Sequence, residues 1–146
     1  MKTTELLKTG NHTRVKKGKP VITMTVLKED TGYSAFSEVG NKSIFTVGET
    51  FEELKVNIIE VLDLTFEESG FTYSIDEIKF LFDIESFFDF YKVINAKALS
   101  ERIGMNQSLL AQYIKGIKKP SPVQMKRILT GVQQIGKELS EVRFLL

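Results

Sequence analysis

The chain of 146 residues has no cysteine, no tryptophan and a single histidine, His12. Without cysteine the chain has no disulfide framework, thiolate zinc site, iron–sulfur cluster or cysteine nucleophile. One histidine also excludes a metal cage built from several imidazole ligands of one chain. We therefore expect no metal centre of these kinds.

Long apolar runs are missing as well. No apolar stretch approaches the roughly 20 residues that span a bilayer, and the first 20 residues lack the apolar core of a signal peptide. The composition, 42% hydrophobic and 27% charged, is typical of globular proteins. The expectation is a cytoplasmic protein without a membrane partner, folded as one domain or two small ones.

Charge is unevenly distributed along the chain. The net charge is +5 over residues 1–20, −11 over residues 21–90 and +7 over residues 91–146. An acidic region suits a basic protein partner, and a basic region suits the phosphate backbone of nucleic acid. The alternative at this point is that the blocks are only solvated surfaces. We assign residues 1–19 to a basic N-terminal tail.

Residues 20–82 have the pattern of a small α/β domain. Alternating hydrophobicity predicts strands at 21–27, 33–37, 43–47 and 75–82, separated by turn signals at 29–32 and 40–42. The capping box that starts at Thr50 predicts a helix from Phe51 to about Glu68. The expected order is therefore strand, strand, strand, helix, strand. One face of the first strand is expected to contain Ile22, Met24 and Val26, and the helix stripe Phe51, Leu54, Ile58, Val61, Leu62 and Thr65.

Catalytic signals are weak in this acidic region. The chain has neither GxxxxGK[ST] nor GxGxxG, so a phosphate-cradling loop is not expected. Its paired carboxylates are neighbours in sequence, and on a helix such neighbours point about 100° apart. We predict that the protein is not an enzyme and carries no cofactor. A metal-dependent nuclease remains the alternative if three or four carboxylates converge in space.

Two segments of this domain resemble the N-terminal domain of HicB-type antitoxins. They are Gly32-Tyr33-Ser34-Ala35-Phe36 and Thr46-Val47-Gly48-Glu49-Thr50-Phe51-Glu52-Glu53-Leu54. The family has a strand ending in Gly-Tyr-hydrophobic-Ala and then a Gly-Asp/Glu-Thr-x-Glu-Glu motif that opens a helix. The resemblance implies a truncated, degenerate RNase H-like domain that lacks the catalytic acids.

Residues 83–146 have the pattern of an all-helical domain. Helices are expected at 84–93 after Asp83, at 96–103 after Asn95 and at 107–114 after Asn106. The turn at Gly104 favours a positive φ, which glycine adopts readily. A last helix opens at Ser121-Pro122-Val123-Gln124. Its apolar stripe contains Met125, Ile128, Leu129, Val132, Ile135 and Leu139.

The segment from Leu99 to Pro122 closely resembles the helix-turn-helix of the phage-repressor (Xre/Cro) class. Two short helices around a glycine turn are the pattern of that motif. Ser100 is small where the two helices cross, and the buried contacts are assigned to Leu99, Ile103, Leu110 and Tyr113. The alternative is a helical hairpin whose glutamines and lysines are only solvated.

The second helix of this motif carries the candidate contacts to double-stranded operator DNA. Gln107 can pair bidentately with adenine in the major groove. Ser108 can reach a base edge or a phosphate, and Asn106 lies where helix amides suit a phosphate. Gln112 is expected on nearly the same face, and Leu109 either contacts a thymine methyl or is buried. Backbone contacts are assigned to Lys115, Lys118 and Lys119.

A single motif reads one half-site, so the resemblance implies a homodimer or a higher homo-oligomer. The candidate dimer surface is the last helix and the tail, with Gly131 and Gly136 allowing close approach. The apolar tail residues are Val142, Phe144, Leu145 and Leu146. The alternative is that this tail folds back onto its own core.

HicB antitoxins of one subclass join the two kinds of domain in this order, over residues 20–140 here. The resemblance implies a type II toxin–antitoxin system, in which the antitoxin masks a basic, mRNA-cleaving HicA-type toxin and represses its own operon. We assign toxin contact to the exposed carboxylates Glu49, Glu52 and Glu53. The expected organisation is α+β: a tail (1–19), a partial RNase H-like domain (20–82) and an all-α helix-turn-helix domain (83–146). The alternative function is a stand-alone Xre-type repressor whose N-terminal domain dimerises or senses a ligand.

Overall fold

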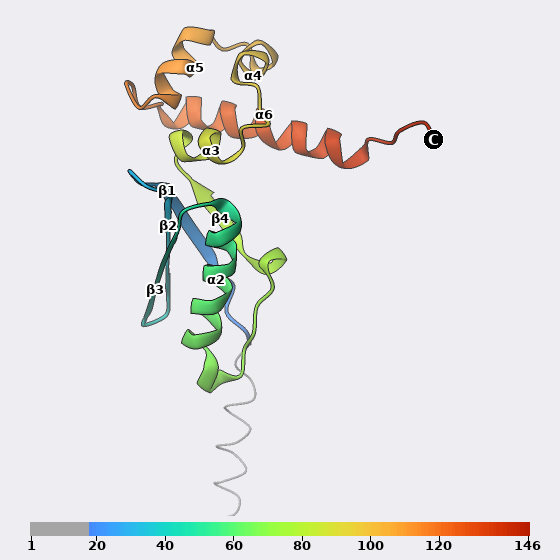
Figure 1. The fold of residues 1–146 in the computed structure, drawn as a ribbon. Coiled ribbons are helices and arrows are strands. Elements are labelled where there is room, and N and C mark those ends of the chain that lie inside the picture. The colour runs from blue at the N-terminus through green and yellow to red at the C-terminus, as the bar shows by residue number, and fades with distance from the viewer. Residues whose placement is uncertain (1–17) are drawn as a thin grey trace, which may run out of the picture. The chain divides into compact units, whose positions relative to one another are not determined.

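The computed structural model describes residues 18–146. His12 and nearly all of the predicted basic tail lie outside this range. The described chain is mixed α+β and divides into two compact units, which we call unit 1 (residues 18–81) and unit 2 (residues 82–146) (Figure 1). The expected boundary between domains lies one residue later, between residues 82 and 83.

Unit 1 is built on a mixed sheet of four strands, counted over residues 18–146. The strands are β1 (Thr23–Lys28), β2 (Tyr33–Val39), β3 (Lys42–Gly48) and β4 (Lys79–Phe82), in the order β3-β2-β1-β4. β1 and β3 both run antiparallel to β2. Next to β1, the N–H of Lys79 donates to the carbonyl of Ile22 at 3.0 Å. A four-residue turn, residues 29–32, joins β1 to β2, and Gly32 with φ 72° lets this first hairpin close.

Helix α2 (Phe51–Thr65) packs on one face of this sheet (Figure 1). The expected face of β1 is confirmed, because Ile22, Met24 and Val26 are all fully buried. From α2 the stripe contributes Leu54, Ile58 and Leu62 to the same core, together with Ala35 and Ile44 of the strands. The opposite face of the sheet stays open and exposes Phe36, Phe45, Val47 and Leu81.

The start of α2 is close to the predicted capping box. The hydroxyl of Thr50 accepts from the N–H of Glu53 at 3.1 Å, as expected. The Glu53 carboxylate reaches back one residue further than expected and accepts from the N–H of Glu49 at 3.1 Å. The helix is shorter than predicted: it ends at Thr65, and a separate 3-10 turn, η1, covers Glu67–Ser69.

The fourth strand was predicted over residues 75–82, and its first half is wrong. Residues Ile75–Glu77 form a 3-10 turn, η2, and β4 begins only at Lys79. The cause is a second capping box, in which the Glu77 carboxylate accepts from the N–H of Ser74 at 3.0 Å. This local bonding competes with extended backbone, and alternating hydrophobicity does not register it.

Unit 2 contains α3 (Ile84–Phe90), α4 (Ala96–Ile103), α5 (Gln107–Ile114) and α6 (Pro122–Glu141). Each of the four predicted caps forms its bond to the backbone three residues on: Asp83, Asn95, Asn106 and Ser121. α3 is three residues shorter than expected, because Tyr91 leaves helical geometry. Gly104 has φ 67° and ends α4 in the predicted left-handed turn.

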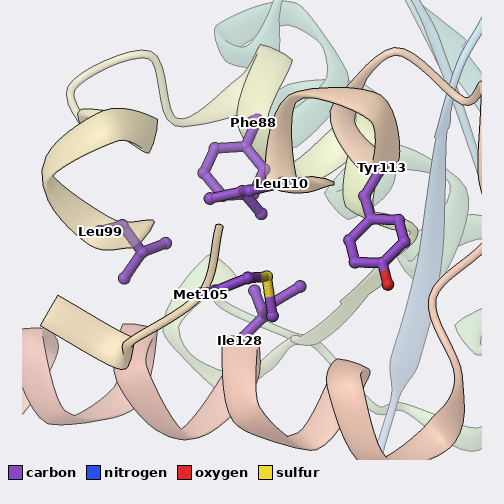
Figure 2. Packing of buried hydrophobic residues seen from close by; sticks show 6 residues of the cluster. All are labelled: Phe88, Leu99, Met105, Leu110, Tyr113 and Ile128. Atoms are coloured by element: carbon purple, nitrogen blue, oxygen red, sulfur yellow. The ribbon is translucent and has the colours of Figure 1, made fainter. Parts of the chain in front are cut away.

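A single cluster forms the core of unit 2 (Figure 2). It consists of Phe88, Leu99, Met105, Leu110, Tyr113 and Ile128, which come from α3, α4, the turn, α5 and α6. Three of the four residues predicted to supply buried contacts are in it, and the fourth, Ile103, packs against it partly buried. Ser100 is 1% exposed at the crossing of α4, and its hydroxyl donates to the carbonyl of Lys97. The turn between α4 and α5 is therefore fixed by packing from every helix of the unit.

Gly131 and Gly136 of α6 were both expected to allow close approach of a second copy, and this expectation is wrong for Gly131. Gly131 is buried, and a Cβ at this position would collide with the side chain of Ile103. Its close contact is therefore between α4 and α6 of one chain and is not available to a second copy. Gly136 has open space around it. The tail residues Val142, Phe144, Leu145 and Leu146 are exposed and do not fold back onto the core of unit 2.

Within residues 18–146, no helix combines the length and apolarity needed to cross a membrane.

Candidate functional site

The outward surface of α5 brings several predicted contact residues together. Gln107, Ser108, Lys115, Lys118 and Lys119 are all exposed. The two lysines after α5 stand on a loop that bends back over the helix, because the N–H groups of Ile117 and Lys118 donate to the carbonyl of Gln112. The arrangement places the side-chain amide of Gln107 at the start of the helix and the lysine ammonium groups at and after its end.

A hollow of about 150 Å³ lies at this surface. Its floor is apolar, made of Ala96, Ala111 and Ile114, and its rim carries Gln107 and Lys115. Lys97, in the first turn of α4, also lines it. Sequence reasoning missed Lys97, because only the packing of α4 against α5 brings that residue beside Gln107.

Three other predicted contacts have different surroundings. The Asn106 side chain accepts from the N–H of Leu109 at 3.2 Å, so it acts as the helix cap. Leu109 is partly buried and packs against the core cluster, which favours the buried reading of this residue over the thymine contact. Gln112 is half-buried and does not line the hollow. Five residues turn a helix by about 500°, so Gln112 lies about 140° around α5 from Gln107, and its assignment to the same face is wrong.

Arg127 fixes the turn that precedes α5. Its guanidinium donates to the carbonyls of Ile103 and Gly104 at 2.9 and 3.0 Å, and to the Gln124 side chain at 2.9 Å. The last carbonyls of α4 have no partner within their helix, and a cation at a helix C-terminus is favourable. Arg127 is therefore a positioning residue for α5. No local pattern could reveal it, since it lies 23 residues after Gly104.

The carboxylates assigned to toxin contact lie together at the start of α2. Glu49, Glu52 and Glu53 are exposed. The Glu53 carboxylate caps the helix by accepting from the N–H of Glu49, and the Glu52 carboxylate forms a salt bridge with Lys55 at 2.9 Å. Further along the helix, Glu60 and Asp63 are also exposed. Sequence reasoning did not single out these two residues, although their spacing from Glu52 and Glu53 continues one outward side of the helix.

At the base of unit 1 a small polar cluster ties the chain entering β1 to η2. Lys19 Nζ lies 2.6 Å from a Glu77 carboxylate oxygen and 4.4 Å from the centre of the Tyr73 ring. The Tyr73 hydroxyl donates to the carbonyl of Pro20 at 2.7 Å. The hydrogen bond from Lys19 and the bond from the Ser74 N–H lower the pKa of Glu77, whereas burial, aided by the Glu77 charge, raises the pKa of Tyr73. These contacts have a structural role.

No group of three or more histidine, aspartate or glutamate side chains within residues 18–146 could hold a metal ion.

No family model, no curated protein and no solved structure matches the chain.

Proposed function

We propose that this protein is a HicB-type antitoxin of a type II toxin–antitoxin system. Unit 1 binds and masks a basic, mRNA-cleaving HicA-type toxin. Unit 2 represses the operon by binding double-stranded operator DNA with α4 and α5 as a helix-turn-helix. In this proposal the protein acts by binding, as a homodimer or higher homo-oligomer, and not by catalysis.

The observation that carries the proposal is the exposed start of α5. Gln107 stands free of the core beside Lys97 and Lys115, while Leu110 and Tyr113 anchor the other side of the same helix. A glutamine at the start of a recognition helix can donate to N7 and accept from N6 of adenine. Lysines around it neutralise phosphates and set the register. A merely solvated hairpin would not need the rigid turn that Gly104 and Arg127 provide.

The charge of unit 1 supports the toxin half of the proposal. The exposed carboxylates Glu52, Glu60 and Asp63 lie on α2, and the open face of the sheet instead exposes Phe36 and Phe45. A basic RNA-binding protein is attracted to the acidic side by its net field, which raises the association rate. We therefore place toxin contact on the outer side of α2, with Glu49, Glu52 and Glu53 at its N-terminal end.

The first experiment is co-expression with the small open reading frame adjacent in the genome, scored by growth and by co-purification. A partner that is toxic alone, and bound and silenced together with this chain, supports the antitoxin. No toxic neighbour and no complex would favour the stand-alone repressor, whose unit 1 dimerises or senses a ligand.

The DNA half is tested with the fragment upstream of the gene, by fluorescence anisotropy. Gln107→Ala should weaken binding by about 1–3 kcal/mol and relax the preference at one base pair. Gln133→Ala is the matched control, because Gln133 is an exposed glutamine on α6. Equal, small effects of the two variants would remove Gln107 from the readout. Absence of any DNA binding by the intact chain would refute the repressor.

A further inference from the structure

A groove of about 570 Å³ lies where α4 packs against α6. It is lined by Arg102 and Ile103 of α4 and by Val123, Lys126, Arg127, Thr130, Gly131 and Gln134 of α6. The hollow at the start of α5 shares none of these residues. Lys97 of that hollow and Arg102 of the groove are five residues apart on α4, so they point about 140° apart around the helix. The groove is therefore a second concave surface of unit 2, outside the candidate DNA contacts.

Part of the lining of this groove is apolar. Val123 is 72% exposed, and Ile103 is partly buried. Gly131 leaves the backbone of α6 without a side chain, and a Cβ there would lie 2.4 Å from Cγ2 of Ile103. The two helices are thus in direct contact at Gly131, which closes the groove on its inner side. An apolar group that enters the groove therefore buries surface on Val123 and Ile103, which is favourable.

The charged residues that line the groove are all cations: Arg102, Lys126 and Arg127. Arg102 is paired with Glu138 at 2.8 Å. In the part of the chain that the structure describes, Arg127 donates only to uncharged groups, namely two backbone carbonyls and a glutamine side chain. Lys126 is exposed and has neither a hydrogen bond nor an ion pair to any described residue. Two positive charges at the groove are therefore not offset by a carboxylate of the described chain.

The groove is long and open. Along α6 it runs from residue 123 to residue 134, which is about 16 Å or three helical turns. Its walls come from two helices only, and Thr130 and Gln134 are exposed beside it. Pockets for small molecules enclose most of the ligand surface, which a groove with two walls does not do. An elongated ligand fits it better, and a helix laid in a groove is a recurring form of peptide recognition.

We propose that this groove binds an acidic amphipathic helix of another protein, about three turns long. Its apolar side chains pack on Ile103 and Val123, and its carboxylates pair with Lys126 and Arg127. Complementary charge determines this choice of partner, because no carboxylate of residues 18–146 lines the groove. Duplex DNA is also anionic, but its phosphate backbone has no apolar side chain to bury on Val123. The proposal goes beyond the antitoxin function, since this partner is neither the basic toxin nor the operator.

A synthetic peptide with leucines on one side of its helix and glutamates beside them is the probe. When it is titrated into the full isotope-labelled chain, the NMR amide signals of Ile103, Val123 and Gly131 should shift. The signals of Gln107 and of α2 should stay where they are. A peptide with lysine at every glutamate position keeps the length and the leucines, so it is the matched control for charge. This control peptide should leave the signals of the groove unchanged.

Variants of the chain test the two kinds of contact separately. Lys126→Glu should raise the dissociation constant of the acidic peptide about tenfold or more, because a repulsion replaces an attraction. Lys92→Glu changes the net charge equally at an exposed lysine outside the groove, and it should raise the constant less than about twofold. Val123→Gln should raise it about threefold or more through lost apolar contact, whereas Leu139→Gln, at an exposed position of α6 outside the groove, should not. All four positions are exposed, so each variant should keep the circular dichroism of the native chain.

The proposal is overturned if millimolar acidic peptide leaves the groove signals in place, if the lysine peptide shifts them equally, or if Lys126→Glu and Lys92→Glu lose equal affinity. A short DNA duplex of unrelated sequence is the last probe. If it shifts the groove signals and Lys126→Glu abolishes these shifts, the groove belongs to the DNA surface and the proposal is wrong. None of these measurements contains toxin or operator. Their failure therefore leaves the antitoxin proposal standing, and failure of the co-expression experiment leaves the groove proposal standing.

Discussion

Replacement of Leu110 by alanine tests whether the two units unfold independently of each other. Leu110 is 1% exposed at the centre of the cluster that joins all four helices of unit 2. Removing a buried leucine side chain costs about 2–5 kcal/mol. A unit of this size has a total stability of only about 3–10 kcal/mol. Leu110→Ala should therefore unfold a substantial fraction of unit 2, and operator binding should weaken with it.

Amide hydrogen exchange is the assay, because it reports each unit separately. The opening free energies of α4 and α5 amides should fall by about 2–5 kcal/mol, and those of β1, β2 and α2 should stay unchanged. The mirror variant Leu54→Ala, at a fully buried position of unit 1, should give the opposite pattern. Parallel loss of protection in both units would refute the division of the chain into two stability units. A loss below about 1 kcal/mol would refute the central place of Leu110 in the core.

Three further variants probe single interactions. Lys118→Ala should weaken binding to all DNA sequences alike and reduce the slope of log K against log salt by about 0.9. The control Lys137→Ala, on α6, should leave this slope unchanged. A loss of affinity for some sequences only would contradict a phosphate contact of Lys118. Contacts of Lys19 and Ser74 hold the pKa of Glu77 below its usual 4.5. The folding stability that Glu77 contributes should therefore be lost as pH falls through that lowered pKa. The acid unfolding curve of Glu77→Gln should lack this pH-dependent loss of stability. Gly136→Ala should stabilise unit 2 by about 1 kcal/mol, because Gly136 has open space around it. Gly131→Ala should destabilise unit 2, because the new methyl group meets Ile103. The same sign for both variants would contradict the packing of α4 on α6.

Local features of the fold could be predicted from the sequence because their causes are local. The caps at Thr50, Asn95 and Ser121 each depend on a side chain and an amide three residues away. The first three strands depend on alternation that one face of the sheet enforces. The prediction was wrong at β4, where the capping box at Ser74 and Glu77 won over alternation.

The candidate site was predictable only where it lies on one helix. Gln107 and Lys115 are eight residues apart, so helical geometry alone places them on one side of α5. Lys97 joins them through the packing of two helices, and Arg127 supports the turn from a third. Neither contact has a signature in local sequence. For the same reason, the sequence could not distinguish Gly131 from Gly136. A Cβ added at Gly131 would meet Ile103, whereas one added at Gly136 would meet open space.

The three sides of α6 explain how one small unit can have several roles without conflict. Ile128 points into the core, Arg127 holds the turn before α5, and Leu129 faces outward. These three consecutive residues are separated by about 100° steps around the helix. Leu129 stands on the helix that the sequence predicts as the dimer surface, so Leu129→Glu should weaken any pairing of two copies while the turn and the surface of α5 keep their geometry. The Leu129→Glu chain should still bind DNA, but with the affinity of a single half-site, so self-association and base readout can be measured apart.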